Sequence, residues 1–143
     1  LPDELLELAK GGGKMLLRHL REARDEPHPA WNVPAINRDK LKRFRRSKYF
    51  HLECGYEDVM AAAKPAFSSL LKDLIALPTD VAKEARLDLF HACMVDLNEV
   101  NNDEDLDQGI DTEECDFFCG LLEQIAHMAG LDNIDDVLAQ RDW

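Results

Sequence analysis

Residues 56–77 read YEDVMAAAKPAFSSLLKDLIAL, and this stretch decides the fold class. Its apolar residues recur every three or four positions, at Val59, Ala63, Phe67, Leu70, Leu74 and Leu77. Apolar residues with this spacing fall on one face of an α-helix. The stretch therefore predicts a helix over Tyr56–Leu77, which Pro65 should either kink or divide.

The same helical spacing returns twice further along the chain. It predicts a helix over Asp80–Asn101 that Thr79 caps, and its apolar stripe comprises Ala82, Ala85, Leu89, Cys93, Leu97 and Val100. It also predicts a helix over Thr112–Ala129 that Gly130 stops. Beyond it, Asp132 is expected to cap a last short helix that runs to about Gln140.

The first 48 residues are rich in basic residues and contain several glycines and prolines, which interrupt helices. They predict helices over Pro2–Lys10 and Lys14–Asp25, a proline-containing loop at 26–37, and a basic helix that Asn37 caps and that runs to about Lys48. No stretch shows the alternation of a strand. We expect an all-α, antiparallel helical bundle of about five to six helices in a single domain 1–143, in which basic residues 1–48 precede an acidic helical core at 49–143.

Charge is distributed very unevenly along the chain. Residues 1–55 hold 12 Lys and Arg against 8 Asp and Glu, whereas residues 56–143 hold 5 against 21, for a net charge of −12. Such polarisation costs stability through self-repulsion, and its natural use is to attract a cationic partner. It disfavours nucleic acid and anionic membranes as partners. The chain shows neither an apolar run of spanning length nor a signal peptide at its start. Its four cysteines need not form disulfides in a chain with a core of this size, so we expect a cytoplasmic protein.

The acidic loop between the two best helices has two interpretations. Read as a calcium loop of the EF-hand type, its ligands would be Asp103, Asp105, Asp107, Asp111 and Glu114. The glycine that this loop needs at its sixth position is replaced by Gln108. Read as a helix start, Asp111 and Glu114 form a capping box, and Ile110 with Cys115 forms a hydrophobic staple. We favour capping and retain calcium as the alternative.

Other groupings of reactive residues carry less weight. A zinc site of His91, Cys93, Cys115 and Cys119 lacks the close cysteine pairs of structural zinc sites, so we expect core cysteines instead. No nucleophile lies beside a base in a recognisable pattern, so we expect neither catalysis nor a cofactor. The basic run over residues 38–48 could grip a phosphate backbone, but docking on the chain's own acidic half or on a second copy fits the net charge better.

Three short motifs resemble a known group of proteins. They are Leu97-Asn98-Glu99, Ile110-Asp111-Thr112-Glu113-Glu114 and Phe117-Phe118. Over about residues 49–130 the chain resembles small acidic all-helical bacterial proteins of unassigned activity, among them candidate immunity proteins of toxin systems. The resemblance implies a protein that captures its partner quickly and needs no catalytic residues.

The sequence therefore predicts a non-catalytic binding protein with a basic protein partner. A homodimer of this chain is also possible. The expected contact residues are Asp88, Asp96, Glu99, Asp103, Glu104, Asp105, Asp107 and Asp111. A calcium-binding domain and a self-associating helical regulator or scaffold are the alternatives. An acidic surface that faces a cationic cleft can raise association rates to about 10⁸–10⁹ M⁻¹s⁻¹.

Overall fold

The computed structural model describes residues 33–143, whose regular structure is helical throughout. Its elements are α3 (Arg38–Arg46), a short 3₁₀ helix η2 (Leu52–Cys54), α4 (Glu57–Ala76), α5 (Lys83–Asn101), α6 (Thr112–Met128) and α7 (Ile134–Val137). No strand is found between Val33 and Trp143, and the all-α prediction is confirmed for this part. The helices expected at Pro2–Lys10 and Lys14–Asp25, and residues 26–32 of the proline-containing loop, lie outside the described residues.

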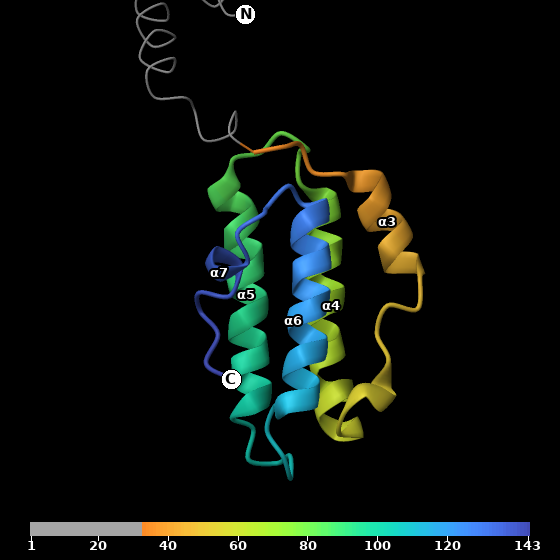
Figure 1. Ribbon diagram of the computed structural model, residues 1–143, viewed down its shortest axis with the longest axis vertical. Coiled ribbons are helices and arrows are strands. Elements are labelled where there is room, and N and C mark those ends of the chain that lie inside the picture. The colour runs from red at the N-terminus through yellow and green to blue at the C-terminus, as the bar shows by residue number, and fades with distance from the viewer. Residues whose placement is uncertain (1–32) are drawn as a thin grey trace, which may run out of the picture. The chain divides into compact units, whose positions relative to one another are not determined.

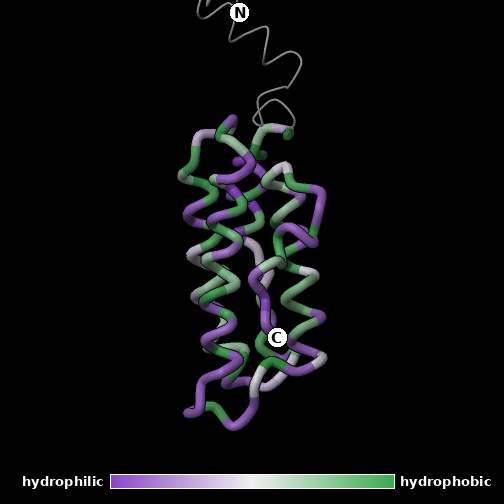
Figure 2. The backbone as a smooth tube through the Cα atoms, turned by 90° about the vertical axis from the view of Figure 1, so that its left-hand side faces the viewer, coloured by the Kyte–Doolittle hydropathy of each residue, from purple (hydrophilic) through white to green (hydrophobic). Residues whose placement is uncertain are grey.

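The long helices α4, α5 and α6 run side by side in alternating directions (Figure 1). α3 packs against α4 and α6, and α7 packs against α5 and α6. Polar and apolar stretches alternate along each long helix in Figure 2, as expected for helices that bury one face. Because the directions alternate, the α5–α6 connection and the start of α4 lie at the same end of the bundle (Figure 1).

The core of the bundle is built largely from the predicted apolar stripes. The α4 residues that are at most 2% exposed include Val59, Ala63, Phe67, Leu70 and Leu74. The rings of Phe67 and Phe118 lie 5.4 Å apart between centroids and join α4 to α6. A fully buried side chain of this size contributes about 1.5–3 kcal/mol, so these contacts account for much of the packing of α6 on α4.

Pro65 lies inside α4 without dividing it, because the helix continues from Glu57 to Ala76. Proline lacks an N–H, so the carbonyl of Ala61 one turn earlier loses its helical donor. Ala61 and Pro65 are both exposed, and water can satisfy that carbonyl. Of the two expectations for Pro65, division of the helix is therefore wrong.

Two predicted helix ends are confirmed. The Asn37 side chain accepts a hydrogen bond from the N–H of Lys40 at 3.1 Å and caps α3. Gly130 has a φ of 78°, and the N–H of Leu131 donates to the carbonyl of Ala126 at 2.8 Å. This pairing closes α6 with the left-handed turn that glycine adopts readily.

The expected Thr79 cap is wrong, because α5 begins later, at Lys83. The carbonyl of Thr79 accepts a hydrogen bond from the N–H of Ile36 at 2.8 Å, which ties the α4–α5 connection to the segment before α3. Residues 79–82 are therefore used as a connection and not as the first turn of the helix. A contact across 43 residues leaves no trace in local sequence preference.

The expected Asp132 cap is also wrong, by one residue. Asn133 precedes α7, and its side chain accepts a hydrogen bond from the N–H of Asp135 at 3.0 Å. The helix ends at Val137, short of the expected Gln140. Asn and Asp are almost equally good caps, so side-chain preference alone could not separate the two positions.

The buried face of α5 is centred differently from the predicted stripe. Its buried residues are Arg86, Phe90, Cys93, Met94 and Leu97. Ala85 and Leu89 of the predicted stripe are only partly buried. The shift arises because a charged residue, Arg86, occupies a core position with no exposed surface.

Arg86 joins three segments at the end of the bundle where α5 begins. Its side chain donates five hydrogen bonds of 2.6–3.3 Å to the backbone carbonyls of Pro34, Thr79, Val81 and Ala129. Burial lowers the pKa of Arg86, and attraction to Asp80 acts in the opposite direction. The planar guanidinium presents enough donors to satisfy all four carbonyls, which a lysine could not do.

Between residues 33 and 143, each helix is too short or too polar to cross a lipid bilayer.

Candidate functional site

The α5–α6 connection carries most of the predicted contact residues and lies beside the start of α4 (Figure 1). The first turns of α4 and α6 add further carboxylates at this end of the bundle. We name this surface the acidic end, and its residues are Glu57, Asp58, Asp103, Glu104, Asp105, Asp107, Asp111 and Glu113. All eight residues are exposed to solvent.

The connection is closed by its own hydrogen bonds. Asn101, the last residue of α5, accepts a bond from the N–H of Ile110 at 2.9 Å through its side-chain oxygen. Gly109 passes so close that an added Cβ would lie 2.8 Å from this oxygen. At the other side of the loop, the Asp103 carboxylate accepts from the N–H of Asp105 at 2.8 Å. These contacts fix the loop that presents the carboxylates.

The predicted capping box is confirmed, and Glu114 does more than cap. Its Oε1 accepts from the N–H of Asp111 at 2.9 Å, while Asp111 Oδ1 accepts from the N–H of Thr112 at 2.8 Å. Glu114 Oε2 accepts from the N–H of Tyr56 at 2.6 Å. With 1% of its surface exposed, Glu114 ties the start of α6 to the start of α4. A Cβ at Gly55 would overlap this carboxylate.

The alternative calcium site is not formed. Its ligands would be Asp103, Asp105, Asp107, Asp111 and Glu114. A calcium loop needs Glu114 as a bidentate ligand, but both carboxylate oxygens are already bonded to backbone N–H groups. Throughout residues 33–143 no three His, Cys, Asp or Glu side chains are placed to hold a metal ion. The order of acidic residues matches the motif, whereas the local geometry serves capping.

Tyr56 stands exposed in the middle of the acidic end, with 48% of its surface accessible. On one side it borders a hollow of about 280 Å³ that Glu57, Asp58 and Asp107 also line. On the other side it borders a hollow of about 370 Å³ shared with Asp111 and Glu113. An aromatic face between carboxylates suits a Lys or Arg side chain through both cation–π attraction and ion pairing.

Sequence reasoning did not select Tyr56 as a candidate residue. Its only signal is an aromatic residue directly before the acidic pair Glu57-Asp58, a common arrangement at a helix start. Its position beside Asp111 depends on the bond from its N–H to Glu114, 58 residues away. No local sequence pattern predicts that bond.

The predicted contact residues on α5 divide into two groups. Asp96, Glu99 and Asp103 line one hollow of about 350 Å³ between α4 and α5, opposite Pro65 and Ser69. Asp88 is exposed but lies, along the helix axis, about 12 Å from Asp96 and about 20 Å from Asn101, where α5 ends and the loop begins. The structure therefore groups Asp96 and Glu99 with the loop and leaves Asp88 apart.

No residue of the acidic end forms an ion pair within the described part of the chain. Its ion pairs are Lys83–Asp136 at 3.2 Å and the weaker contact of His51 with Glu53 at 3.8 Å. Neither pair includes a residue of the acidic end. On the basic helix α3, Arg38 is bonded to the carbonyls at the end of α4. Among residues 33–143, the negative field of the acidic end is therefore not cancelled by a paired cation.

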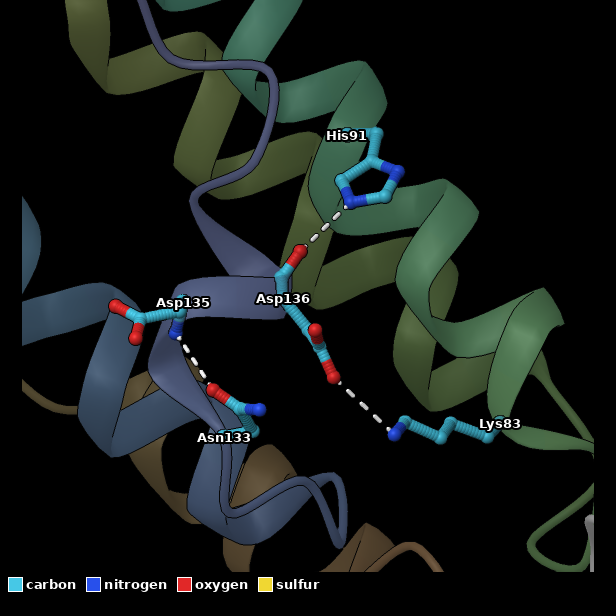
Figure 3. A network of polar contacts seen from close by, with 5 residues as sticks. All are labelled: Lys83, His91, Asn133, Asp135 and Asp136. Atoms are coloured by element: carbon cyan, nitrogen blue, oxygen red, sulfur yellow. Dashed lines mark hydrogen bonds and ion pairs between the residues drawn. The ribbon is translucent and has the colours of Figure 1, made fainter.

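The histidine of the possible zinc site is committed to another contact. His91 Nε2 donates to the carbonyl of Asp136 at 2.8 Å, and the Asp136 carboxylate pairs with Lys83 (Figure 3). Cys93 is buried in the core, as expected, but the same expectation is wrong for Cys115 and Cys119, which are only partly buried and lie outside the core cluster. His91 and Cys93 therefore do not join the remaining two cysteines around a metal ion, and this network ties α7 to α5 instead.

No protein-family model matches the chain, and no curated protein or solved structure is significantly similar to it.

Proposed function

We propose that this chain is a non-catalytic binding protein of the immunity or antitoxin type. It neutralises a basic protein partner by covering the partner's cationic site with the acidic end. The observation that carries the proposal is the gathering of eight exposed carboxylates at one end of the bundle, without an ion pair to a described Lys or Arg. The resemblance over residues 49–130 agrees with this function.

The geometry also suggests how such a complex gains specificity. The carboxylates of the acidic end, which pair with no Lys or Arg of residues 33–143, create a directed field that raises the rate of encounter with a positive surface. Tyr56 and its two neighbouring hollows offer a place where individual cationic side chains can be held. Aromatic residues at the centre of an interface often supply a large share of its affinity.

The test measures association with a defined cationic probe, a fluorescein-labelled peptide rich in Lys and Arg, by stopped flow. We expect the association rate to fall by at least about tenfold between low salt and a salt concentration of about 0.5 M, because screening removes the attraction. A rate that is nearly independent of salt contradicts the proposal. Where a neighbouring gene encodes a toxin domain, its product is the partner to use in the same measurement.

A pair of matched variants separates the effect of the acidic end on association from the effect of net charge. Asp103→Asn, Asp105→Asn and Asp107→Asn together remove three charges from the acidic end. The control removes three exposed charges elsewhere, through Asp73→Asn, Glu84→Gln and Asp132→Asn. We expect only the first variant to lose most of the fast association. Equal losses in both variants would show that net charge alone attracts the probe.

Self-association is the second candidate, and the basic helix supports it. Seven Lys and Arg residues lie between Arg38 and Lys48, and none forms an ion pair within the described residues. α3 lies toward the opposite end of the bundle from the acidic end (Figure 1). Two copies could therefore pair α3 of one with the acidic end of the other. Light scattering across a salt series distinguishes this from capture of a separate partner.

A further inference from the structure

Two free thiols and a guanidinium meet on α6, and the proposed function uses none of them. Cys115 and Cys119 are four residues apart and therefore share one face of the helix. Both are partly buried. Arg141 Nη1 lies 3.0 Å from the sulfur of Cys119 and 3.8 Å from that of Cys115. One cationic nitrogen thus contacts both sulfurs.

The segment that carries Arg141 is held on both sides of this residue. Asn98 of α5 donates to the carbonyl of Gln140 at 2.8 Å and accepts from the N–H of Asp142 at 3.0 Å. The Arg141 guanidinium also lies 5.2 Å from the ring centre of Trp143. The indole therefore reports on where the guanidinium is.

The spacing of the two cysteines suits a bridging ion better than a disulfide. Helix residues four apart have Cβ atoms about 5–6 Å apart, whereas a disulfide requires about 3.5–4.5 Å. A disulfide between Cys115 and Cys119 would therefore distort α6. Two metal–sulfur bonds of about 2.3 Å span about 4.6 Å when they are collinear, so an ion can bridge the sulfurs without unwinding the helix.

We propose that Cys115 and Cys119 form a two-sulfur site for Cu(I), and that the ion takes the place of the Arg141 guanidinium between the sulfurs. Thiolates select soft ions, and Cu(I) is stable with two collinear ligands. Zn(II) requires about four ligands, and no third donor of the usual kinds is grouped with these two among residues 33–143.

The binding step balances in protons and charge. Each thiol releases one proton, and the ion with two thiolates carries one negative charge, which the nearby Arg141 offsets. Burial and the neighbouring Cys115 raise the pKa of the Cys119 thiol, while Arg141 acts in the opposite direction.

The test titrates Cu(I) anaerobically into the full chain in competition with a chromogenic Cu(I) chelator. A Trp31→Phe background leaves Trp143 as the only tryptophan. We expect one equivalent of Cu(I) to bind and the Trp143 emission to change as Arg141 moves away. Cys115→Ser or Cys119→Ser should each lower the affinity by at least about 100-fold, because each removes a direct ligand.

Cys54→Ser is the matched control, since Cys54 is also free and partly buried but has no cysteine one turn away. It should leave the affinity unchanged. Equal losses in the three serine variants, or no loss in any of them, overturn the site. Copper binding without a change in emission contradicts the displacement of Arg141. Zn(II) that competes equally well overturns the preference for a two-coordinate ion, and circular dichroism verifies that every variant is folded.

Discussion

Arg86 shows what a single buried residue does for this fold. Its five hydrogen bonds satisfy carbonyls from the segment before α3, the α4–α5 connection and the end of α6. A buried carbonyl without a donor lowers the free energy of unfolding by about 1–3 kcal/mol. Removing the Arg86 side chain leaves several carbonyls without a donor at the same time. Gly130 is part of the same arrangement, since a Cβ there would lie 2.6 Å from the guanidinium.

Arg86→Met should lower the free energy of unfolding by about 3–5 kcal/mol, because methionine fills similar space but donates no hydrogen bond. Urea denaturation followed by circular dichroism measures the loss. Arg38→Met is the control, since Arg38 donates to two carbonyls, of Ile75 and Leu77, and is only partly buried. It should cost about 1–2 kcal/mol. Similar losses of unfolding free energy in both variants would show that Arg86 stabilises the fold no more than Arg38 does.

At the scale of elements, Glu114 decides how α6 meets α4. Its carboxylate accepts from the N–H groups of Asp111 and Tyr56, one through each oxygen. Glu114→Gln keeps one acceptor and turns an NH₂ group toward the other N–H, so the unfolding free energy should fall by about 1–3 kcal/mol. Glu113→Gln, at the exposed neighbouring position, should change it by less than about 0.5 kcal/mol. Thermal unfolding of both variants checks this, and a stable Glu114→Gln variant would show that the link is dispensable.

Sequence reasoning succeeded where the deciding contacts are local. The stripe in α4 and the Asp111–Glu114 capping box involve residues three or four positions apart, so periodicity and side-chain preference identify them. It failed for Arg86 because that residue's partners include Ala129, 43 positions away. A charged residue in the middle of a helix gives no local sign that backbone carbonyls surround it.

The candidate site was predictable to a similar extent. The loop acids are visible in composition alone, and the structure places them together at one end with Asp96 and Glu99 nearby. Asp88 is acidic and belongs to the same helix, but its axial distance separates it from the loop. Sequence reasoning does not find Tyr56 because the bond that brings it close to Asp111 joins residues 58 positions apart.

For the whole molecule, the acidic end should cost stability in the free protein. Asp103 lies two residues beyond Asn101, the last residue of α5, near the negative end of the helix dipole, and its neighbours Asp105 and Asp107 repel it. The acidic-end variant Asp103→Asn, Asp105→Asn, Asp107→Asn should therefore be more stable than the original chain at low salt, by about 0.5–1.5 kcal/mol. Its Asx turn is preserved, because asparagine can accept the same bond from the N–H of residue 105.

Salt should abolish this difference, since screening weakens repulsion between exposed charges. Differential scanning calorimetry at low salt and at about 0.5 M salt measures the melting temperatures of both proteins. The control variant at residues 73, 84 and 132 should gain less, because those carboxylates lie on separate elements and are not clustered. If the acidic-end variant is less stable at low salt, the loop carboxylates stabilise the fold, and their clustering is explained without a partner. If the acidic-end variant is more stable but associates slowly with the cationic probe, the three carboxylates lower the stability of the free protein and raise its rate of association.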